Sequence, residues 1–388
     1  MVDRSQFRDS YHYGLAVASE VVAPALRVVA RAASRSGPVP PENWRSGVII
    51  GKGHIGDVLY RTCSLETLHD GLPDCSWSYL TTATAGAVLA GNPALADVLP
   101  WSLDTEEQPL APGRYEEMAR RRFDVALCSD NIAHHHALML ALRLGIPNRV
   151  GFTRKGLSGL VTLGVATDGP TSHPAAFRRM VESATQVHDT SPLRPRIYPS
   201  AGDIDAADSE WERLKMDGAE FVIASAVTTR QTIGDFPPEF FVDILRRALA
   251  LAPGARVLLS GSAEDRSILD AIAVELGNRA VVSAGILPLL AYGAILRRCA
   301  VFVGADSGPR HLANAADIPV FFVRNMGATE IGSGKYCPTE IDIAPRGEYL
   351  SPQAMRRALD DVDRDAVANA IVSAARQQVR GSIADTPS

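Results

Sequence analysis

The sequence is poor in cysteine, and the few cysteines that it has are scattered. Their number is odd, and no two of them form a Cys-x-x-Cys pair; they are Cys63, Cys75, Cys128, Cys299 and Cys337. A disulfide-stapled domain needs paired cysteines, and a structural zinc site needs closely spaced ones. The sequence therefore predicts neither, and the compartment that we expect is the reducing cytoplasm.

A strong excess of charge is lacking as well. The 388 residues carry a formal net charge of −5, with 21% charged and 46% hydrophobic side chains. Such a chain has no global basic field to hold nucleic acid, so no nucleic-acid partner is expected. The composition is typical of a folded globular protein.

The sequence also has no unbroken apolar run of transmembrane length. Its most apolar segment, 13–33, is interrupted by Glu20, Arg27 and Arg31, and the flanks do not suit a signal peptide. We expect one amphipathic helix here, packed on the protein surface within an N-terminal helical extension, residues 1–46. The functional alternative is a weak membrane-surface or partner contact through these arginines and Arg35, which would make the protein peripheral to the inner face of the membrane.

From residue 47 onward, short apolar strands alternate with helical patterns, which is typical of parallel sheets with crossover helices. A chain of this length predicts two domains, and the Pro-rich passage 191–199 is the best linker. We therefore expect Rossmann-like domains over 47–198 and 199–345. C-terminal helices and a flexible tail, disordered after Gln377, are expected over 346–388. The expected strands are 47–50, 77–80, 98–99, 124–128, 221–226, 256–261, 280–285, 299–304 and 319–323.

A glycine-rich loop follows the first expected strand. Residues 51–57 read Gly-Lys-Gly-His-Ile-Gly-Asp and precede a helical pattern, as in a dinucleotide-binding fingerprint. That fingerprint also needs an acidic residue after the second strand, where this chain has Thr81 and Thr82, so an NAD-dependent oxidoreductase is a minor alternative. Asp57 at the helix start either caps the helix or serves as a general base. The motif leaves both roles open.

The more informative motif is the strand–turn–helix pattern at 299–323. A β-branched run ends at Gly304-Ala305, the turn 306–311 reads Asp-Ser-Gly-Pro-Arg-His, and an alanine-rich helical pattern follows. This geometry points free backbone N–H groups and the positive end of a helix dipole at an anion. An ordinary capped helix after a buried strand is the alternative interpretation.

With these two motifs, the chain resembles glycosyltransferase family 9, the ADP-heptose:lipopolysaccharide heptosyltransferases. Three further segments agree in order. Residues 150–155 are similar to the family's GFxRK segment, 228–238 to its nucleotide-phosphate loop, and 260–265 to its GxxxE segment. The resemblance extends from about residue 47 to the C-terminal helix.

The resemblance implies an α/β protein with the GT-B fold: two Rossmann-like doubly wound domains facing across a cleft. The first would bind the acceptor and the second a nucleotide-diphosphate sugar, ADP-heptose. Sugar transfer would invert the anomeric carbon and need no metal or other cofactor. Asp57 would be the base, beside the loop residues Gly53, His54 and Gly56.

The resemblance also implies the donor-binding residues. The backbone around Ser307 and Gly308 would bind the donor diphosphate together with His311, and Glu264 would reach the ribose or base. The full set is Thr228, Thr229, Arg230, Glu264, Asp306, Ser307, Gly308 and His311. Preorganised N–H dipoles of this kind stabilise the charge that develops on a leaving diphosphate.

The chain departs from the family in two places. The family's phosphate loop carries a lysine shortly after its Thr-Thr-Arg-like segment, but residues 230–237 contain none, and Arg230 is the obvious substitute. The family also has a basic residue two places before the glycine equivalent to Gly53, where this chain has Gly51, with Lys52 adjacent. The missing lysine leaves more of the diphosphate to the turn 306–311.

The acceptor is less defined. Its candidate contacts are Arg61, His134, Arg154 and Lys155, and the consecutive histidines 134–136 point apart on a helix, so a metal site is not expected there. This modest basic set fits a glycan or glycolipid, or a small acceptor of a secondary-metabolite glycosyltransferase that uses another nucleotide sugar. A GT-B nucleotide-sugar epimerase or hydrolase and a non-catalytic nucleotide-sugar-binding protein are further alternatives.

Overall fold

The computed structural model describes residues 10–51, 53–100, 112–128, 134–166, 171–228, 237–324, 334–343, 347 and 351–384. The chain divides into two compact units, Met1–Leu193 and Arg194–Ser388. The division falls inside the Pro-rich passage 191–199, five residues before the boundary expected from the sequence.

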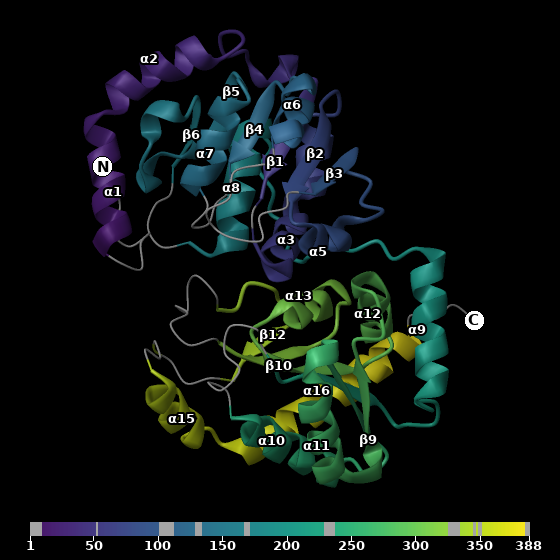
Figure 1. The fold of residues 1–388 in the computed structure, drawn as a ribbon. Coiled ribbons are helices and arrows are strands. Elements are labelled where there is room, and N and C mark those ends of the chain that lie inside the picture. Colours follow the sequence, from purple (N-terminus) through teal and green to yellow (C-terminus); the bar gives the residue numbers. More distant parts are fainter. Residues whose placement is uncertain are drawn as a thin grey trace. The chain divides into compact units, whose positions relative to one another are not determined.

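Each unit contains a parallel sheet, with six strands among the described residues (Figure 1). In the first unit the strands are β1 (Ser46–Ile50), β2 (Ser76–Thr81), β3 (Asp97–Pro100), β4 (Val125–Cys128), β5 (Asn148–Phe152) and β6 (Leu163–Val165). In the second they are β7 (Val222–Ala226), β8 (Arg256–Gly261), β9 (Ala280–Ala284), β10 (Val301–Ala305), β11 (Val320–Val323) and β12 (Glu340–Asp342).

The strand orders are β3-β2-β1-β4-β5-β6 and β9-β8-β7-β10-β11-β12. Both follow the 3-2-1-4-5-6 order of a Rossmann fold, so the connection changes direction between β1 and β4 in one unit and between β7 and β10 in the other. Ligands of such sheets bind beyond the carboxyl ends of the strands at this switch point. The central strands are buried along their length because helices cover both faces, which explains their nearly continuous apolar sequences.

Helices connect the strands. In the first unit they are α1 (Ser10–Val21), α2 (Ala23–Ala33), α3 (Ile55–Arg61), α4 (Leu65–Gly71), α5 (Ala83–Gly86), α6 (Pro112–Arg120), α7 (His134–Arg143) and α8 (His173–Thr185). In the second they are α9 (Ala201–Arg213), α10 (Pro238–Leu251), α11 (Arg266–Leu276), α12 (Leu289–Leu296), α13 (Gly308–Ala315), α15 (Pro352–Asp360) and α16 (Arg364–Ala384).

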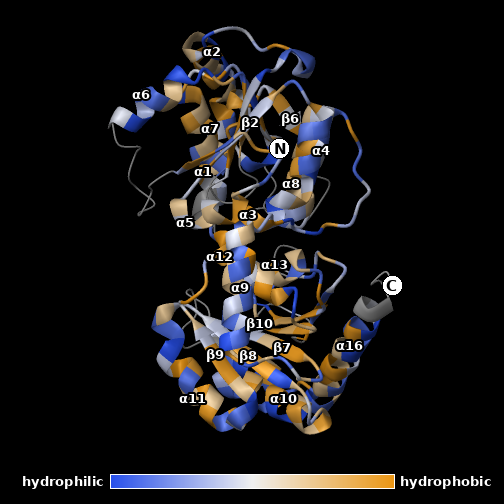
Figure 2. Ribbon diagram, turned by 90° about the vertical axis from the view of Figure 1, so that its right-hand side faces the viewer, coloured by the Kyte–Doolittle hydropathy of each residue, from blue (hydrophilic) through white to orange (hydrophobic). Residues whose placement is uncertain are grey.

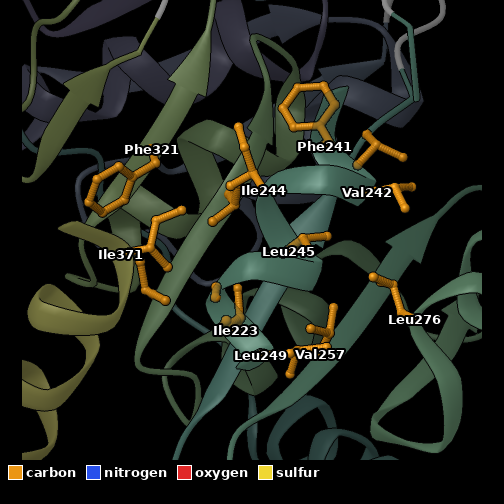
Figure 3. Packing of buried hydrophobic residues seen from close by; sticks show 14 of the residues in the cluster. Ile223, Phe241, Val242, Ile244, Leu245, Leu249, Val257, Leu276, Phe321 and Ile371 are labelled. Atoms are coloured by element: carbon orange, nitrogen blue, oxygen red, sulfur yellow. The ribbon is translucent and has the colours of Figure 1, made fainter. Parts of the chain in front are cut away.

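Each unit has its own hydrophobic core. In the first, α6, α7 and α2 pack on one side of the sheet, while α8 contacts both α3 and α4. In the second, the core joins α10, α11, α15 and α16 to the strands; Figure 3 shows Ile244 of α10, Ile223 of β7 and Ile371 of α16 among its members. Both α10 and α16 carry hydrophobic and hydrophilic residues along their length, as expected of helices that cover a sheet with one face (Figure 2).

The N-terminal segment is not the single helix that the sequence predicted. It forms two helices that meet at Val22, because Pro24 has no N–H group to bond the carbonyl of Glu20 and its ring would clash with that carbonyl in a continuous helix. Among the described residues no single helix is long and apolar enough to cross a membrane; the pair Tyr13–Val21 and Ala23–Ala33, bent by 76°, passes that test of length and composition only when taken together.

Two further expectations need correction. The chain after Gln377 is not disordered throughout, since α16 continues to Ala384, and buried Ala368 and Ile371 anchor this helix in the core. Strands β5, β6 and β12 were not expected. The other nine strands lie where the sequence predicted them, within two residues at either end.

Candidate functional site

The glycine loop of the first unit lies at the carboxyl end of β1, the strand at the switch point. The side chain of Asp57 turns back over the loop, and its Oδ2 accepts a hydrogen bond of 2.7 Å from the backbone N–H of His54. A Cβ at Gly53 would lie 2.4 Å from the Cβ of Asp57, so this close approach requires glycine. The capping role foreseen for Asp57 is therefore present, and the half-buried carboxylate keeps one oxygen outside this bond.

Arg61 is fully buried, which contradicts the expectation of a side chain facing an acceptor. One turn after Asp57 on α3, its guanidinium donates to the Asp57 carbonyl (3.0 Å) and to the hydroxyls of Tyr79 (3.3 Å) and Tyr60 (3.1 Å). The aromatic ring of Tyr60 also lies under this charge. Arg61 thus fixes the first turn of α3 rather than offering its charge to a ligand.

The other acceptor candidates are divided between the interior and the surface. His134 at the start of α7 is buried beside Phe152, contrary to the expected acceptor contact, whereas His135 and His136 are exposed. Arg154 and Lys155 follow β5 in a short 3₁₀ turn, both half-buried, and the Lys155 ammonium lies 5.3 Å from the Phe152 ring centre. These two retain exposed surface at the carboxyl end of a strand.

In the second unit, the turn after β10 also lies at the switch point. Gly304 pairs with Ala226 of β7, and a Cβ on Gly304 would lie 2.3 Å from the Ala226 carbonyl oxygen. Thr228 and Asp306 each follow two residues later, so the two segments leave the sheet side by side. Both predicted donor residues therefore lie at the same edge of the sheet, just beyond paired strand residues.

The capping residue of α13 makes no side-chain hydrogen bond to the helix start. Ser307 occupies the capping position in an extended conformation, but its hydroxyl donates to the Ala305 carbonyl (3.3 Å) rather than accepting from the helix. Pro309 lies in the first turn, where a missing N–H costs nothing. The N–H groups at a helix start have no intrahelical partner, so this turn has the geometry of an anion site.

Arg310 holds the turn in place from the protein interior. Its guanidinium is buried and donates to Oδ1 of Asp306 (2.7 Å), to Oε1 of Glu340 (2.6 Å) and to the carbonyl of Gly334 (2.7 Å). Its centre lies 3.5 Å from the ring centre of Phe322. Asp306, expected on the donor, is thus paired with Arg310.

Glu340 completes this cluster. Its carboxylate, with no exposed surface, also accepts hydrogen bonds from Asn314 Nδ2 (2.7 Å) and from the backbone N–H groups of Tyr336 (2.8 Å) and Cys337 (3.1 Å). Burial alone would raise the pKa of Glu340, but the charge of Arg310 and these hydrogen bonds lower it. Burial likewise opposes the charge of Arg310, and the two carboxylates outweigh burial and raise its pKa.

His311 is held by the same segment. Its Nδ1 lies 2.6 Å from the Tyr336 hydroxyl, and the two rings stack with centres 5.5 Å apart. Asn314 Nδ2 donates to that hydroxyl as well (3.2 Å). The ring of His311, only 9% exposed, therefore has a fixed orientation one turn into α13.

The remaining donor candidates are more dispersed. Glu264 is exposed in the 3₁₀ turn Ala263–Asp265 at the carboxyl end of β8, the neighbour of β7. Thr229 and Arg230 lie outside the described residues. Among the residues that the structure describes, no group of three or more His, Cys, Asp or Glu side chains could hold a metal ion.

Sequence reasoning missed Arg310, Asn314, Tyr336 and Glu340 as parts of the site. Arg310 and Asn314 lie in the strand–turn–helix motif 299–323, and their spacing of four residues places them on one face of α13. Nothing in the short sequence from Tyr336 to Glu340 indicates that its carboxylate returns to this helix.

The two Rossmann-type units, each with its candidate residues at the switch point, define a protein of the GT-B class. The sequence model of glycosyltransferase family 9 (heptosyltransferase) matches residues 115–323, more than half of the chain. The chain therefore belongs to glycosyltransferase family 9. A comparison with curated proteins finds no sequence match.

Solved structures agree with this assignment of the fold. A glycosyl transferase family 9 structure from Veillonella parvula has 17% identity and a TM-score of 0.70, covering 88% of this chain and 98% of that one. E. coli ADP-heptose lps heptosyltransferase II has 18% identity and a TM-score of 0.67, covering 86% and 99%. E. coli heptosyltransferase WaaC with ADP-2-deoxy-2-fluoro heptose has 18% identity and a TM-score of 0.53, covering 81% and 99%.

Proposed function

We propose that this protein transfers heptose from ADP-heptose to a hydroxyl group of a glycan or glycolipid acceptor, with inversion at the anomeric carbon and without a metal ion. The second unit binds the donor, and the first supplies Asp57 as the general base. The observation that carries the proposal is the start of α13 at the switch point of the second unit, where Ser307 makes no side-chain hydrogen bond to the helix and His311 is held in a fixed orientation.

The donor half of the proposal rests on electrostatics. The backbone N–H groups at Ser307 and Gly308 and the His311 ring bind the diphosphate, Thr228 adds a hydroxyl contact, and Asp306 acts through Arg310. Solved relatives hold ADP and ADP-2-deoxy-2-fluoro heptose, which supports an ADP-sugar as donor. Thr229, Arg230 and Glu264 complete the proposed set, with Arg230 in place of the family's lysine.

The base half of the proposal concerns proton transfer. The acceptor hydroxyl gives its proton to Asp57 while its oxygen forms a bond to the anomeric carbon. The bond from that carbon to the donor phosphate breaks, and its electron pair leaves with ADP. The loop residues Gly53, His54 and Gly56 hold the carboxylate in place, and Arg154 and Lys155 bind an acidic acceptor. Arg61 supports this loop from the interior.

Replacing Asp57 with Asn tests the base. The helix α9 offers a matched control, because Asp203 occupies the same third position and accepts from the Ser200 N–H (2.9 Å) as Asp57 does from His54. We expect Asp57→Asn to lower kcat by about 10²–10⁴-fold with ADP affinity unchanged, the range for loss of a general base. Asp203→Asn removes a similar cap without this loss. If both variants retain equal turnover, Asp57 is not the base.

A panel of nucleotides tests the donor. Binding to the folded state raises its stability, so ADP and ADP-heptose should raise the thermal midpoint, and NAD should not. Incubating the donor without acceptor separates transfer from hydrolysis or epimerisation, since free sugar or an epimer appears only in the latter cases. Stabilisation by another nucleotide sugar, with transfer to a small molecule, would favour the secondary-metabolite alternative.

A further inference from the structure

The N-terminal helices α1 and α2 place small residues toward the protein and large apolar residues toward solvent. The buried residue of α1 is Ala16, and those of α2 are Ala23 and Ala30, whose seven-residue spacing puts them on one face of that helix. A surface helix of a globular protein normally does the reverse, because its large apolar side chains supply the burial. This inverted pattern needs an explanation that the proposed reaction does not give.

The inward face is held by close backbone contacts. A Cβ at Gly159 would lie 2.3 Å from the carbonyl oxygen of Ala23, and one at Gly156 would lie 2.9 Å from the Cα of Ala16. Ser19 Oγ accepts from the N–H of Leu157 (2.9 Å), and the Glu20 carboxylate accepts from the N–H of Ser158 (2.8 Å). The pair is therefore docked on the first unit, at the β6 edge of its sheet (Figure 1).

The outward face is apolar. Its large side chains have exposed fractions between 41% and 79%; they are Leu15, Val17, Val21, Val22, Val28 and Val29. They fall within fifteen residues, and such a concentration of exposed apolar side chains marks an interaction surface. We call these six residues the valine face.

The charges beside the valine face are all positive. The one acidic residue of the segment 13–33, Glu20, turns inward to Ser158, whereas Arg27 and Arg31 are exposed along one flank of α2. Arg35, which the sequence grouped with them, donates to the Phe123 carbonyl (2.6 Å) and so serves the fold. Within the segment 13–33, which the structure describes throughout, the exposed surface therefore combines apolar side chains with two cations and no outward-facing carboxylate.

We propose that the valine face, with Arg27 and Arg31, is a docking surface for an anionic lipid bilayer. The valines enter the boundary between headgroups and acyl chains, and the two arginines meet lipid phosphates, as in amphipathic helices that lie in the membrane plane. A second copy of the chain fits less well, because it would bring its own arginines to a face that has no carboxylate to pair them. The proposal is independent of the reaction proposed above.

Vesicle co-sedimentation of the full chain tests this surface. We expect binding to vesicles of phosphatidylcholine mixed with phosphatidylglycerol, weakened by added salt, and much weaker binding to phosphatidylcholine alone. Arg27→Gln with Arg31→Gln should weaken binding to the anionic vesicles by about fivefold for each arginine. The double variant Arg356→Gln with Arg357→Gln changes the net charge equally on exposed positions of α15 and should bind as the wild type does.

The valines have a matched control too. Val28→Ser with Val29→Ser should weaken vesicle binding by roughly tenfold for each valine that enters the apolar layer. Val274→Ser removes a valine that is 83% exposed on α11 and should have no effect. Circular dichroism checks that the variants fold. Absence of vesicle binding, or binding that the valine variants do not weaken, overturns the proposal. So does self-association without lipid that the valine variants abolish, which would make this face a contact between copies.

Discussion

Among single residues, Arg310 and Glu340 form the most deeply buried ion pair of those described. Their side chains are 1% and 0% exposed, and Asp306 adds a second carboxylate. A pair of this kind adds little net stability compared with apolar residues, yet breaking it leaves an uncompensated buried charge. Because this pair ties β12 to the start of α13, the geometry of the turn 306–311 depends on it.

Replacing Glu340 with Gln should lower the free energy of unfolding by about 3–5 kcal/mol at neutral pH, since Arg310 loses its buried partner. Urea unfolding of the variant measures this loss. Glu275→Gln is the control, because Glu275 pairs with Arg246 on the surface, where both side chains are more than half exposed, and such pairs contribute about 0–1 kcal/mol. Equal losses in the two variants would contradict the buried-pair account.

The same pair predicts a pH dependence. The pKa of Glu340 is lowered in the fold, so its stabilisation is complete above the pKa of an unfolded glutamate, about 4.3, and is lost as the pH falls through the lower folded value. The difference in stability between wild type and Glu340→Gln should therefore shrink below about pH 4. A difference that stays constant from pH 7 to acid would exclude ionised Glu340 as its source.

Tyr336 is a positioning residue for His311 if His311 binds the donor as proposed. Tyr336→Phe keeps the stacked ring and removes the hydroxyl 2.6 Å from Nδ1, so ADP affinity should fall by about fivefold, the worth of one hydrogen bond. Calorimetry measures the affinity, and kinetics should show a raised donor KM. Tyr292→Phe removes a buried hydroxyl that contacts Ser260 instead and should leave ADP affinity unchanged.

Sequence patterns predicted the elements best where burial on both faces makes a strand uniformly apolar. Strands β7 and β10 are of this kind. Of the missed strands, β6 and β12 are three-residue strands at the sheet edges, and β5 is an inner strand that begins with the polar residues Asn148 and Arg149. In β12, Glu340 opens the strand and Asp342 closes it, and only the tertiary contact with Arg310 explains why a charged residue is buried there. The break between α1 and α2 has a local cause, because Pro24 cannot continue a helix that begins before it.

Sequence patterns predicted the backbone of the candidate site better than the directions of its side chains. A strand–turn–helix pattern fixes where the backbone N–H groups at residues 306–308 lie, because that geometry is local. The direction of a long charged side chain is not local. Arg61 and His134 were expected on an acceptor as members of a basic set in the first domain, yet both are buried, although such residues are mostly exposed or partly exposed in proteins.

The docking of α2 depends on glycine at its contact with the first unit. Gly159→Ala places a methyl group against the Ala23 carbonyl at 2.3 Å, so the helix must shift, at a cost of about 1–3 kcal/mol in stability. Hydrogen exchange should show faster exchange of α2 amides in the variant. Gly113→Ala is the control, since no atom lies within 4 Å of a Cβ there. Unchanged exchange in α2 would show that the contact does not hold the helix.

At the scale of the whole molecule, the chain is two folding units with separate cores, and the family match spans parts of both. The Rossmann order occurs in both units, so the fold itself does not reveal which one binds a nucleotide. The two units differ in the turns that follow their switch-point strands. In the first unit a half-buried carboxylate lies over the loop. In the second, Ser307 makes no side-chain hydrogen bond to the helix start, and a histidine of fixed orientation lies one turn into the helix. This contrast supports donor binding by the second unit.

That division of roles predicts where ADP protects the chain. ADP at about a hundred times its Kd stabilises the state that binds it by about 2.7 kcal/mol, and we expect hydrogen exchange to slow in β7, β10 and α13 of the second unit. The loop 51–57 should respond less, since ADP lacks the sugar to be transferred and brings no acceptor to engage Asp57. Gly308→Val should abolish this protection, because a branched side chain at the first residue of α13 crowds the bound phosphate. Gly202→Val is the control, because it changes a glycine near the start of another helix, α9. Protection confined to the first unit, or equal protection in both glycine variants, would mean that the nucleotide binds elsewhere.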